Sequence, residues 1–115
     1  MISSGYVPDA GDIVWMQYDP QAGREQGGHR PAVVLSPASY NGRIGLVICC
    51  PTTTRIKGYP FEVALAGLPH SVVLADHVRS LDWRARKATR KSKVSATELA
   101  EVLYKLNTLI GFEDG

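Results

Sequence analysis

The chain has 115 residues, of which 44% are hydrophobic and 21% are charged, and its formal net charge is +2. These values are typical of one water-soluble globular domain spanning residues 1–115, which is large enough to form a core without disulfides. No apolar run approaches the ~20 residues of a membrane-spanning helix. The N-terminal residues also lack the basic and apolar regions of a secretory signal, so no membrane association is predicted.

The first half of the chain predicts two strands separated by a long polar loop. Residues 12–18 are rich in β-branched and aromatic side chains, which favours a strand. A polar loop follows over residues 19–30. Residues 32–36 then form an apolar run between two prolines, which predicts a second, buried strand.

The polar loop carries an acid, an imidazole and a guanidinium within a few residues: Glu25, His29 and Arg30. These side chains are the types that proton transfer on an anionic substrate requires. Arg30 precedes a proline, which restrains its backbone, and its planar fork suits bidentate binding of a phosphate. A solvated loop with a salt bridge between Glu25 and Arg30 is the alternative interpretation.

Residues 44–50 predict a third strand, which an Asn41-Gly42 turn precedes and Pro51 ends. Cys49 and Cys50 are adjacent in this strand, so a disulfide between them would be strained. Two free thiols indicate a reducing compartment, the cytoplasm. No Cys or His pair has the spacing of metal ligands, so neither a metal nor another cofactor is predicted.

Three consecutive threonines, Thr52 to Thr54, follow the third strand. Hydroxyl groups at a strand end can donate hydrogen bonds to a phosphoryl oxygen, although β-branched residues are also common there. Further strands are predicted over residues 61–65 and 71–75, with a short edge strand over residues 77–81. Five or six short strands with turn signals between them predict a small antiparallel barrel or sandwich.

The last third of the chain contains a basic block and a helix. Seven Lys and Arg residues accompany a single acid, Asp82, over residues 79–93. Such a block is typical of a surface that binds a polyanion, and also of an ordinary solvated surface. Ser95 and Glu98 have the spacing of a capping box, and apolar residues then recur with helical period up to Gly111. This amphipathic helix is expected to close one end of the barrel.

Six segments carry a resemblance to a known family. They are Gly11-Asp12-Ile13-Val14-Trp15, Glu25-Gln26-Gly27-Gly28-His29-Arg30-Pro31, Pro51 with Thr53-Thr54, Lys57-Gly58-Tyr59-Pro60-Phe61, Leu74-Ala75-Asp76-His77-Val78-Arg79-Ser80 and Trp83-Arg84-Ala85-Arg86. In this order the segments resemble the MazF/PemK toxins of bacterial toxin–antitoxin modules, over nearly the whole chain. The most specific element is His-Arg-Pro after an acidic glycine loop, combined with the later Pro-x-Thr-Thr.

The resemblance implies a fold, an activity and partners. The fold would be a small SH3-like/CcdB-like antiparallel barrel, mainly β with a C-terminal helix, in a homodimer. The activity would be that of a cytoplasmic, metal-independent and sequence-specific endoribonuclease, which cuts single-stranded mRNA and inhibits translation. The partner would be a small antitoxin whose acidic, disordered C-terminal tail folds across the RNA groove.

The resemblance also assigns roles to individual residues. The essential arginine of the family matches Arg30, and its essential threonine matches Thr53. The acid that some members use matches Glu25, and the neighbouring histidine matches His29. Many relatives have another residue where this chain has Thr52. The resemblance further implies RNA-binding residues at Lys57, Tyr59, Arg79, Arg84 and Arg86, and groove residues near the antitoxin at Trp15 and Asp76.

The expected reaction is attack of an RNA 2′-OH on the adjacent phosphorus, which leaves a 2′,3′-cyclic phosphate and a 5′-hydroxyl. Glu25 is expected to act as the general base, while Arg30 and Thr53 stabilise the dianionic phosphorane. The proton for the leaving oxygen is expected to come from His29 or from water.

Two other classes of function stay open at this point. One is a gyrase-poisoning toxin on the same fold, which the chain end Gly111-Phe112-Glu113-Asp114-Gly115 disfavours because it lacks an aromatic-Gly-Ile terminus. The other is a nucleic-acid-binding barrel without catalytic activity. The sequence predicts neither the RNA motif that is cut nor the identity of the antitoxin, because base recognition depends on the shape of loops.

Overall fold

The computed structural model of the chain describes residues 5–17 and 29–111. Its elements are β1 (Asp12–Gln17), β2 (His29–Val34), α1 (Ala38–Ile44), β3 (Leu46–Thr53), β4 (Glu62–Ala64), β5 (Val72–Leu74), β6 (Arg79–Asp82), β7 (Thr89–Lys93) and α2 (Ala96–Ile110). The predicted mainly-β architecture with a C-terminal helix is confirmed. In the described part of the chain, no helix is both long and apolar enough to cross a membrane.

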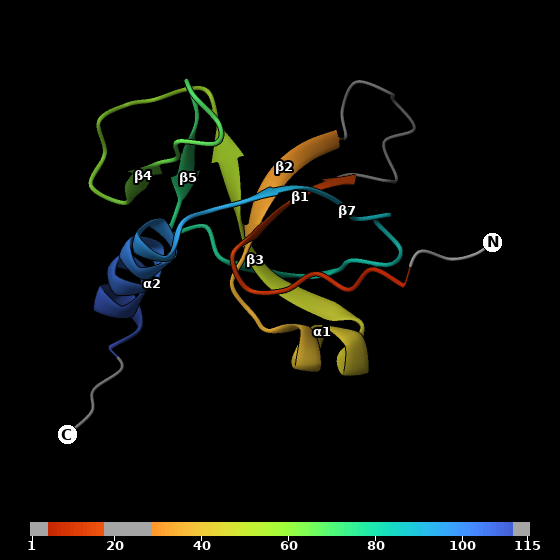
Figure 1. Cartoon of the computed structure of the whole chain (residues 1–115). Coiled ribbons are helices and arrows are strands. Elements are labelled where there is room, and N and C mark those ends of the chain that lie inside the picture. The colour runs from red at the N-terminus through yellow and green to blue at the C-terminus, as the bar shows by residue number, and fades with distance from the viewer. Residues whose placement is uncertain (1–4, 18–28, 112–115) are drawn as a thin grey trace.

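The strands form a single antiparallel sheet around β3. The order is β4-β5-β3-β2-β1-β7, and β6 pairs with β3 as well. One edge of β3 pairs with β2, and the other edge pairs first with β6 and then, at Thr52 and Thr53, with β5. Figure 1 shows the resulting arrangement, with α1 at the beginning of β3, and β4, β5 and α2 grouped near its end.

Both faces of the sheet bury apolar side chains, because neighbouring residues of a strand point to opposite faces. One core cluster contains Ile13, Val33 and Cys50 and extends to Val102 of α2. The other contains Val14, Val34, Val47 and Cys49, with Leu81 and Trp83. The two cysteines therefore lie in different clusters as buried free thiols, in agreement with the prediction that they form no disulfide.

The prediction of a turn at Asn41-Gly42 was wrong, since both residues lie within α1. The Asn41 side chain is fully buried. Its amide donates to the Pro8 carbonyl at 2.7 Å and to the Ser36 carbonyl at 2.9 Å, and its oxygen accepts from the Ser36 hydroxyl at 2.6 Å. These distant contacts outweigh the local preference of Asn-Gly for a hairpin turn.

Most strands differ from the sequence prediction. β2 covers residues 29–34 instead of 32–36, so it begins inside the predicted polar loop, and β4 and β5 are each one residue shorter at both ends. β3 continues through Pro51 to Thr53, because β5 supplies a new hydrogen-bonding partner for the residues beyond the proline. β7 lies within the basic block, where no strand was predicted, and is held by antiparallel pairing with β1. β6 occupies residues 79–82 instead of 77–81.

The predicted capping box of α2 is confirmed. The Ser95 hydroxyl accepts from the backbone N–H of Glu98 at 3.0 Å, and the Glu98 carboxylate accepts from the backbone N–H of Ser95 at 2.9 Å. The helix stops at Gly111, whose left-handed φ of 67° favours glycine. The second oxygen of Glu98 accepts from the backbone N–H of Ala66 at 2.8 Å, which joins the helix to the loop after β4.

Candidate active site

A pocket of about 610 Å³ opens where β2 begins and β3 ends. The described residues that line it are Arg30, Pro31, Thr52, Thr53, Thr54, Arg55 and Ser71. Ala32 pairs with Pro51 at the end of the β2–β3 ladder, and the residues beyond this pair on the two strands lead to the pocket, which both Arg30 and Thr53 line. The fold therefore brings together the two residues that the resemblance assigned to catalysis, and we call this the Arg30–Thr53 pocket.

The three threonines at this pocket have different environments. Thr52 is buried, with 6% of its surface exposed, and its hydroxyl donates to the Pro31 carbonyl at 2.9 Å. Thr53 is half-buried, and its hydroxyl oxygen accepts from the backbone N–H of Arg55 at 3.0 Å. The hydroxyl hydrogen of Thr53 is therefore available to an acceptor in the pocket. Thr54 is exposed.

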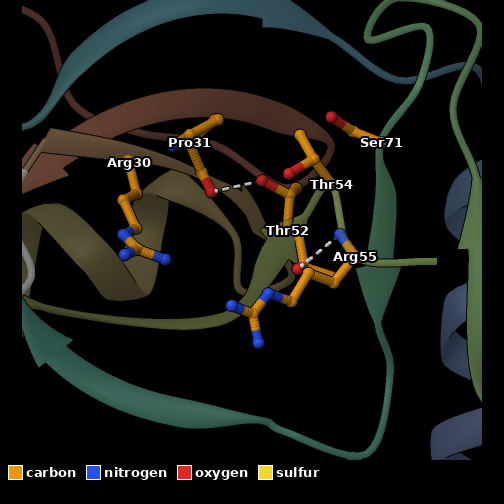
Figure 2. A pocket seen from close by; sticks show the side chains of 7 residues that line it. Arg30, Pro31, Thr52, Thr54, Arg55 and Ser71 are labelled. Carbon is orange, nitrogen blue, oxygen red and sulfur yellow. Dashed lines mark hydrogen bonds between the residues drawn. The ribbon is translucent and has the colours of Figure 1, made fainter. Parts of the chain in front are cut away.

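The charges of the pocket favour an anionic ligand. Arg30 and Arg55 both line it, and none of its described lining residues is acidic. Figure 2 shows the guanidinium groups of Arg30 and Arg55 on the same side of Thr52. Two guanidinium groups and a donating hydroxyl match the oxygens of a phosphodiester, because guanidinium binds phosphate through charge-assisted hydrogen bonds.

Comparison with known families identifies the chain. A family model described as the PemK-like, MazF-like toxin of type II toxin-antitoxin systems matches residues 9–110. The chain belongs to this family. The endoribonuclease toxin MazF of Escherichia coli K12 is 55% identical over 109 residues, which cover 94% of this chain and 98% of that protein. The endoribonuclease PemK of Escherichia coli is 32% identical, over 89% of this chain and 81% of that protein.

Comparison with solved structures supports the same family assignment. A MazE-MazF structure (Form-III) from Deinococcus radiodurans is 57% identical, has a TM-score of 0.86, and covers 94% of this chain and 100% of that chain. A mycobacterial endoribonuclease in complex with its cognate antitoxin has a TM-score of 0.74 at 20% identity, which shows the shared fold alone. The predicted PemK/MazF family and fold are confirmed, and the names of the relatives agree with the expected endoribonuclease activity.

The other catalytic residues expected for a PemK/MazF toxin lie apart from this pocket or outside the described residues. Glu25 belongs to the segment 18–28, of which nothing is described. His29 neighbours Arg30 on β2, but it is not among the described residues lining the pocket. Its ring stacks on Trp15 with 5.7 Å between ring centroids and an interplanar angle of 14°. Lys91 Nζ lies 5.4 Å from the centroid of the same Trp15 ring.

Arg55 is a charged lining residue that was not predicted from the sequence. It follows Thr53 by two residues, and its backbone N–H holds the Thr53 hydroxyl. The available signal in the sequence was a cationic residue directly after three consecutive threonines. Without the position of β2, however, nothing in the sequence indicated that Arg55 shares a pocket with Arg30.

The expected RNA-binding residues separate into two groups. Lys57 and Tyr59 line a second pocket beside the first, and the Tyr59 hydroxyl donates to the Asp76 carboxylate. The arginines at positions 79, 84 and 86 line neither of these two pockets.

Several cations of the basic block have structural partners. Arg84 donates to the Gly42 carbonyl at 3.0 Å and lies over the Trp83 ring at 4.6 Å. Arg86 donates to the Gln17 carbonyl at 2.9 Å. These two arginines therefore also stabilise the fold.

Proposed function

We propose that this PemK/MazF-family chain is a metal-independent, sequence-specific endoribonuclease that cuts single-stranded mRNA and thereby inhibits translation and growth. The observation that carries the proposal is the convergence of Arg30 and Thr53, from separate strands, on one pocket. With Arg55 beside them, these residues form a site suited to the scissile phosphate.

The reaction requires no group other than the RNA and the protein. The 2′-oxygen loses its proton to Glu25 and forms a bond to the adjacent phosphorus. The bond from phosphorus to the 5′-oxygen then breaks, and that oxygen takes a proton from His29 or from water. Arg30 and Thr53 act on the non-bridging oxygens, where negative charge develops, so they bind the phosphorane more tightly than the ground state.

The proposed partners are a cognate antitoxin and a second copy of the chain. A MazE-MazF structure at 57% identity supports the antitoxin. An acidic antitoxin tail would compete with RNA for the cations at positions 79, 84 and 86 and for the surface around Trp15 and Asp76. The target mRNA and the two free thiols both fit the cytoplasm.

The decisive experiment uses the purified protein and defined single-stranded RNA in EDTA. We expect cleavage with 5′-hydroxyl and 2′,3′-cyclic phosphate ends, which mapping of 5′-hydroxyl ends across a long RNA would place in a sequence motif. A single 2′-deoxy substitution at the mapped site should prevent cleavage, because it removes the nucleophile. A requirement for divalent metal, or cleavage of the deoxy-substituted substrate, would overturn the mechanism.

A further inference from the structure

Two aromatic rings stack where β1 ends and β2 begins. The His29 ring lies on the Trp15 ring with 5.7 Å between centroids and an interplanar angle of 14°. His29 is not among the described residues that line the Arg30–Thr53 pocket, whereas its neighbour Arg30 is. Resting on the proposed function, we propose that Trp15 and His29 are positioning residues, which hold the beginning of β2 so that Arg30 meets the scissile phosphate. His29 then acts through its ring, and water supplies the proton for the leaving oxygen.

The register of β1 and β2 places the two rings on one face of the sheet. Trp15 pairs with Pro31, and Gln17 pairs with His29. His29 precedes Pro31 by two residues, so it points to the same face as Trp15, at a diagonal distance that aromatic side chains can span. Arg30 lies between His29 and Pro31 in the strand and points to the other face. The His29 imidazole is therefore directed away from the phosphate that Arg30 would hold.

The backbone at Arg30 has little other support. β2 pairs with β3 only from Ala32 onward, so the residues before it have β1 as their single strand partner in the described part of the chain. Pro31 has no N–H and donates nothing to that ladder. The Pro31 carbonyl accepts from the Thr52 hydroxyl at 2.9 Å, one residue beyond Arg30. A side-chain contact that ties His29 to β1 therefore determines how firmly Arg30 is placed.

The Trp15 ring is itself held in place, which makes it a suitable anchor. It is half-buried, and its neighbours in β1, Val14 and Met16, are fully buried. Lys91 Nζ, on β7, lies 5.4 Å from the ring centroid, which is close enough for a cation–π contact. Stacked rings at this separation attract each other beyond the gain from the area that they bury. The contact therefore extends the rigid part of the sheet to the beginning of β2.

The first test separates the ring of His29 from its proton. His29→Phe keeps a flat ring for Trp15 but has no proton to donate, whereas His29→Ala removes both. In single-turnover cleavage of a defined RNA, His29→Phe should stay within about 3-fold of the wild-type rate, because the stacked pair is kept. His29→Ala should be about 10- to 100-fold slower, the loss expected when a substrate-positioning group is displaced. The rates of the wild type and His29→Phe should depend on pH in the same way.

The second test asks whether Trp15 acts as the partner of His29. Trp15→Leu should slow cleavage about as much as His29→Ala does. The double variant should be no slower than either single variant, because all three lose the same contact. Tyr104→Leu is the control, since it removes an aromatic ring that is 69% exposed on α2 and should leave the rate unchanged. Additive losses in the double variant would mean that Trp15 and His29 act separately, and would overturn the proposal.

The third test reads the placement of Arg30 directly, by NMR on the protein without RNA. In the wild type and in His29→Phe, the order parameter of the Arg30 backbone amide should be about 0.85, the value of a rigid backbone. In Trp15→Leu and His29→Ala it should fall below about 0.6, the range of a flexible segment. An Arg30 order parameter that stayed at the wild-type value in Trp15→Leu would contradict the positioning role.

These measurements keep the positioning role apart from the proposed function. If the wild-type protein cut no RNA, the proposed function would be overturned, while the order parameter of Arg30 would still decide whether Trp15 and His29 hold the strand. If His29→Phe were as slow as His29→Ala although Arg30 stayed ordered, the proton of His29 and not its ring would be required. That result would make His29 a proton donor and overturn the inference.

Discussion

The Thr52 hydroxyl donates a hydrogen bond to the Pro31 carbonyl at 2.9 Å, and this contact joins the end of β3 to the beginning of β2. The next hydroxyl along the chain, on Thr53, accepts from the backbone N–H of Arg55 and keeps its own hydrogen. One threonine therefore maintains the shape of the pocket, and its neighbour is placed to donate to a ligand.

Thr53→Ala should lower the cleavage rate by about 10²–10³-fold, the usual effect of removing one donor to a developing oxyanion. The substitution removes a hydroxyl at a half-buried position, so the melting temperature should change little. The measurement is single-turnover cleavage of a defined RNA, together with thermal unfolding. An unchanged rate would exclude Thr53 from the reaction.

Thr52→Val is the matched comparison. It should keep cleavage within about 3-fold and lower the free energy of unfolding by about 1 kcal/mol, because one hydrogen bond is lost at a buried site. Urea unfolding measures the loss of stability. A large fall in activity with unchanged stability would reverse the roles that we assign to Thr52 and Thr53.

Arg30→Lys should lose about 10²-fold or more in cleavage rate although the positive charge is kept. A lysine ammonium is a point charge and cannot form the planar, two-donor contact that guanidinium makes with a phosphate. The same exchange at the exposed Arg43 on α1, which lines neither described pocket, should leave the rate unchanged. Equal activity of the Arg30→Lys and wild-type proteins would show that charge alone is sufficient.

Asn41→Leu should lower the free energy of unfolding by about 3 kcal/mol, because the Ser36 and Pro8 carbonyls would lose their buried donor. Chemical unfolding in urea gives the value. Asn107→Ala in α2 provides a control, since the structure shows no comparable buried network around that side chain within the described residues. A loss below about 1 kcal/mol for Asn41→Leu would mean that water replaces these contacts.

Local sequence signals predicted some parts of the fold well. The capping box of Ser95 and Glu98 and the stop at Gly111 lie within one segment, so the sequence alone contained the interactions that define α2. α1 and β7 were missed for the opposite reason. Asn41 is held by Pro8, and β7 is held by β1. These partners lie far apart in the sequence, so no local sequence pattern indicates the contacts.

The residues of the candidate site could be predicted only where the family resemblance named them. Arg30 and Thr53 came from matched motifs, and the structure adds that β2 and β3 place them in one pocket with Arg55. The role of Glu25 stays a prediction, because that residue lies outside the described ranges. The stacking of His29 on Trp15 depends on the register of β1 and β2, which the sequence pattern did not fix.

Neither cysteine should react with thiol reagents in the folded protein. Burial raises the pKa of the Cys49 thiol to about 12 and that of the Cys50 thiol to about 12, so the reactive thiolate is scarce at neutral pH. Mass spectrometry after treatment with iodoacetamide should show no alkylation in buffer and two alkylations in denaturant. Rapid labelling of the native protein would show that the sheet opens around β3.

Glu98→Gln should lower stability at neutral pH but not in acid. Hydrogen bonds from the backbone N–H groups of Ala66 and Ser95 hold the pKa of Glu98 below its usual value of about 4.5. Because the pKa of Glu98 is lower in the folded chain than in the unfolded chain, the carboxylate stabilises the fold fully above the unfolded pKa. This contribution is lost as the pH falls through the folded pKa. At neutral pH the free energy of unfolding of the wild type should therefore exceed that of Glu98→Gln by about 1 kcal/mol, the typical contribution of a helix cap. Urea midpoints of the two proteins should converge at about pH 3, where the carboxylate is protonated in the unfolded chain and increasingly in the folded one. A difference that stayed constant from neutral to acidic pH would show that the loss comes from packing and not from the charge.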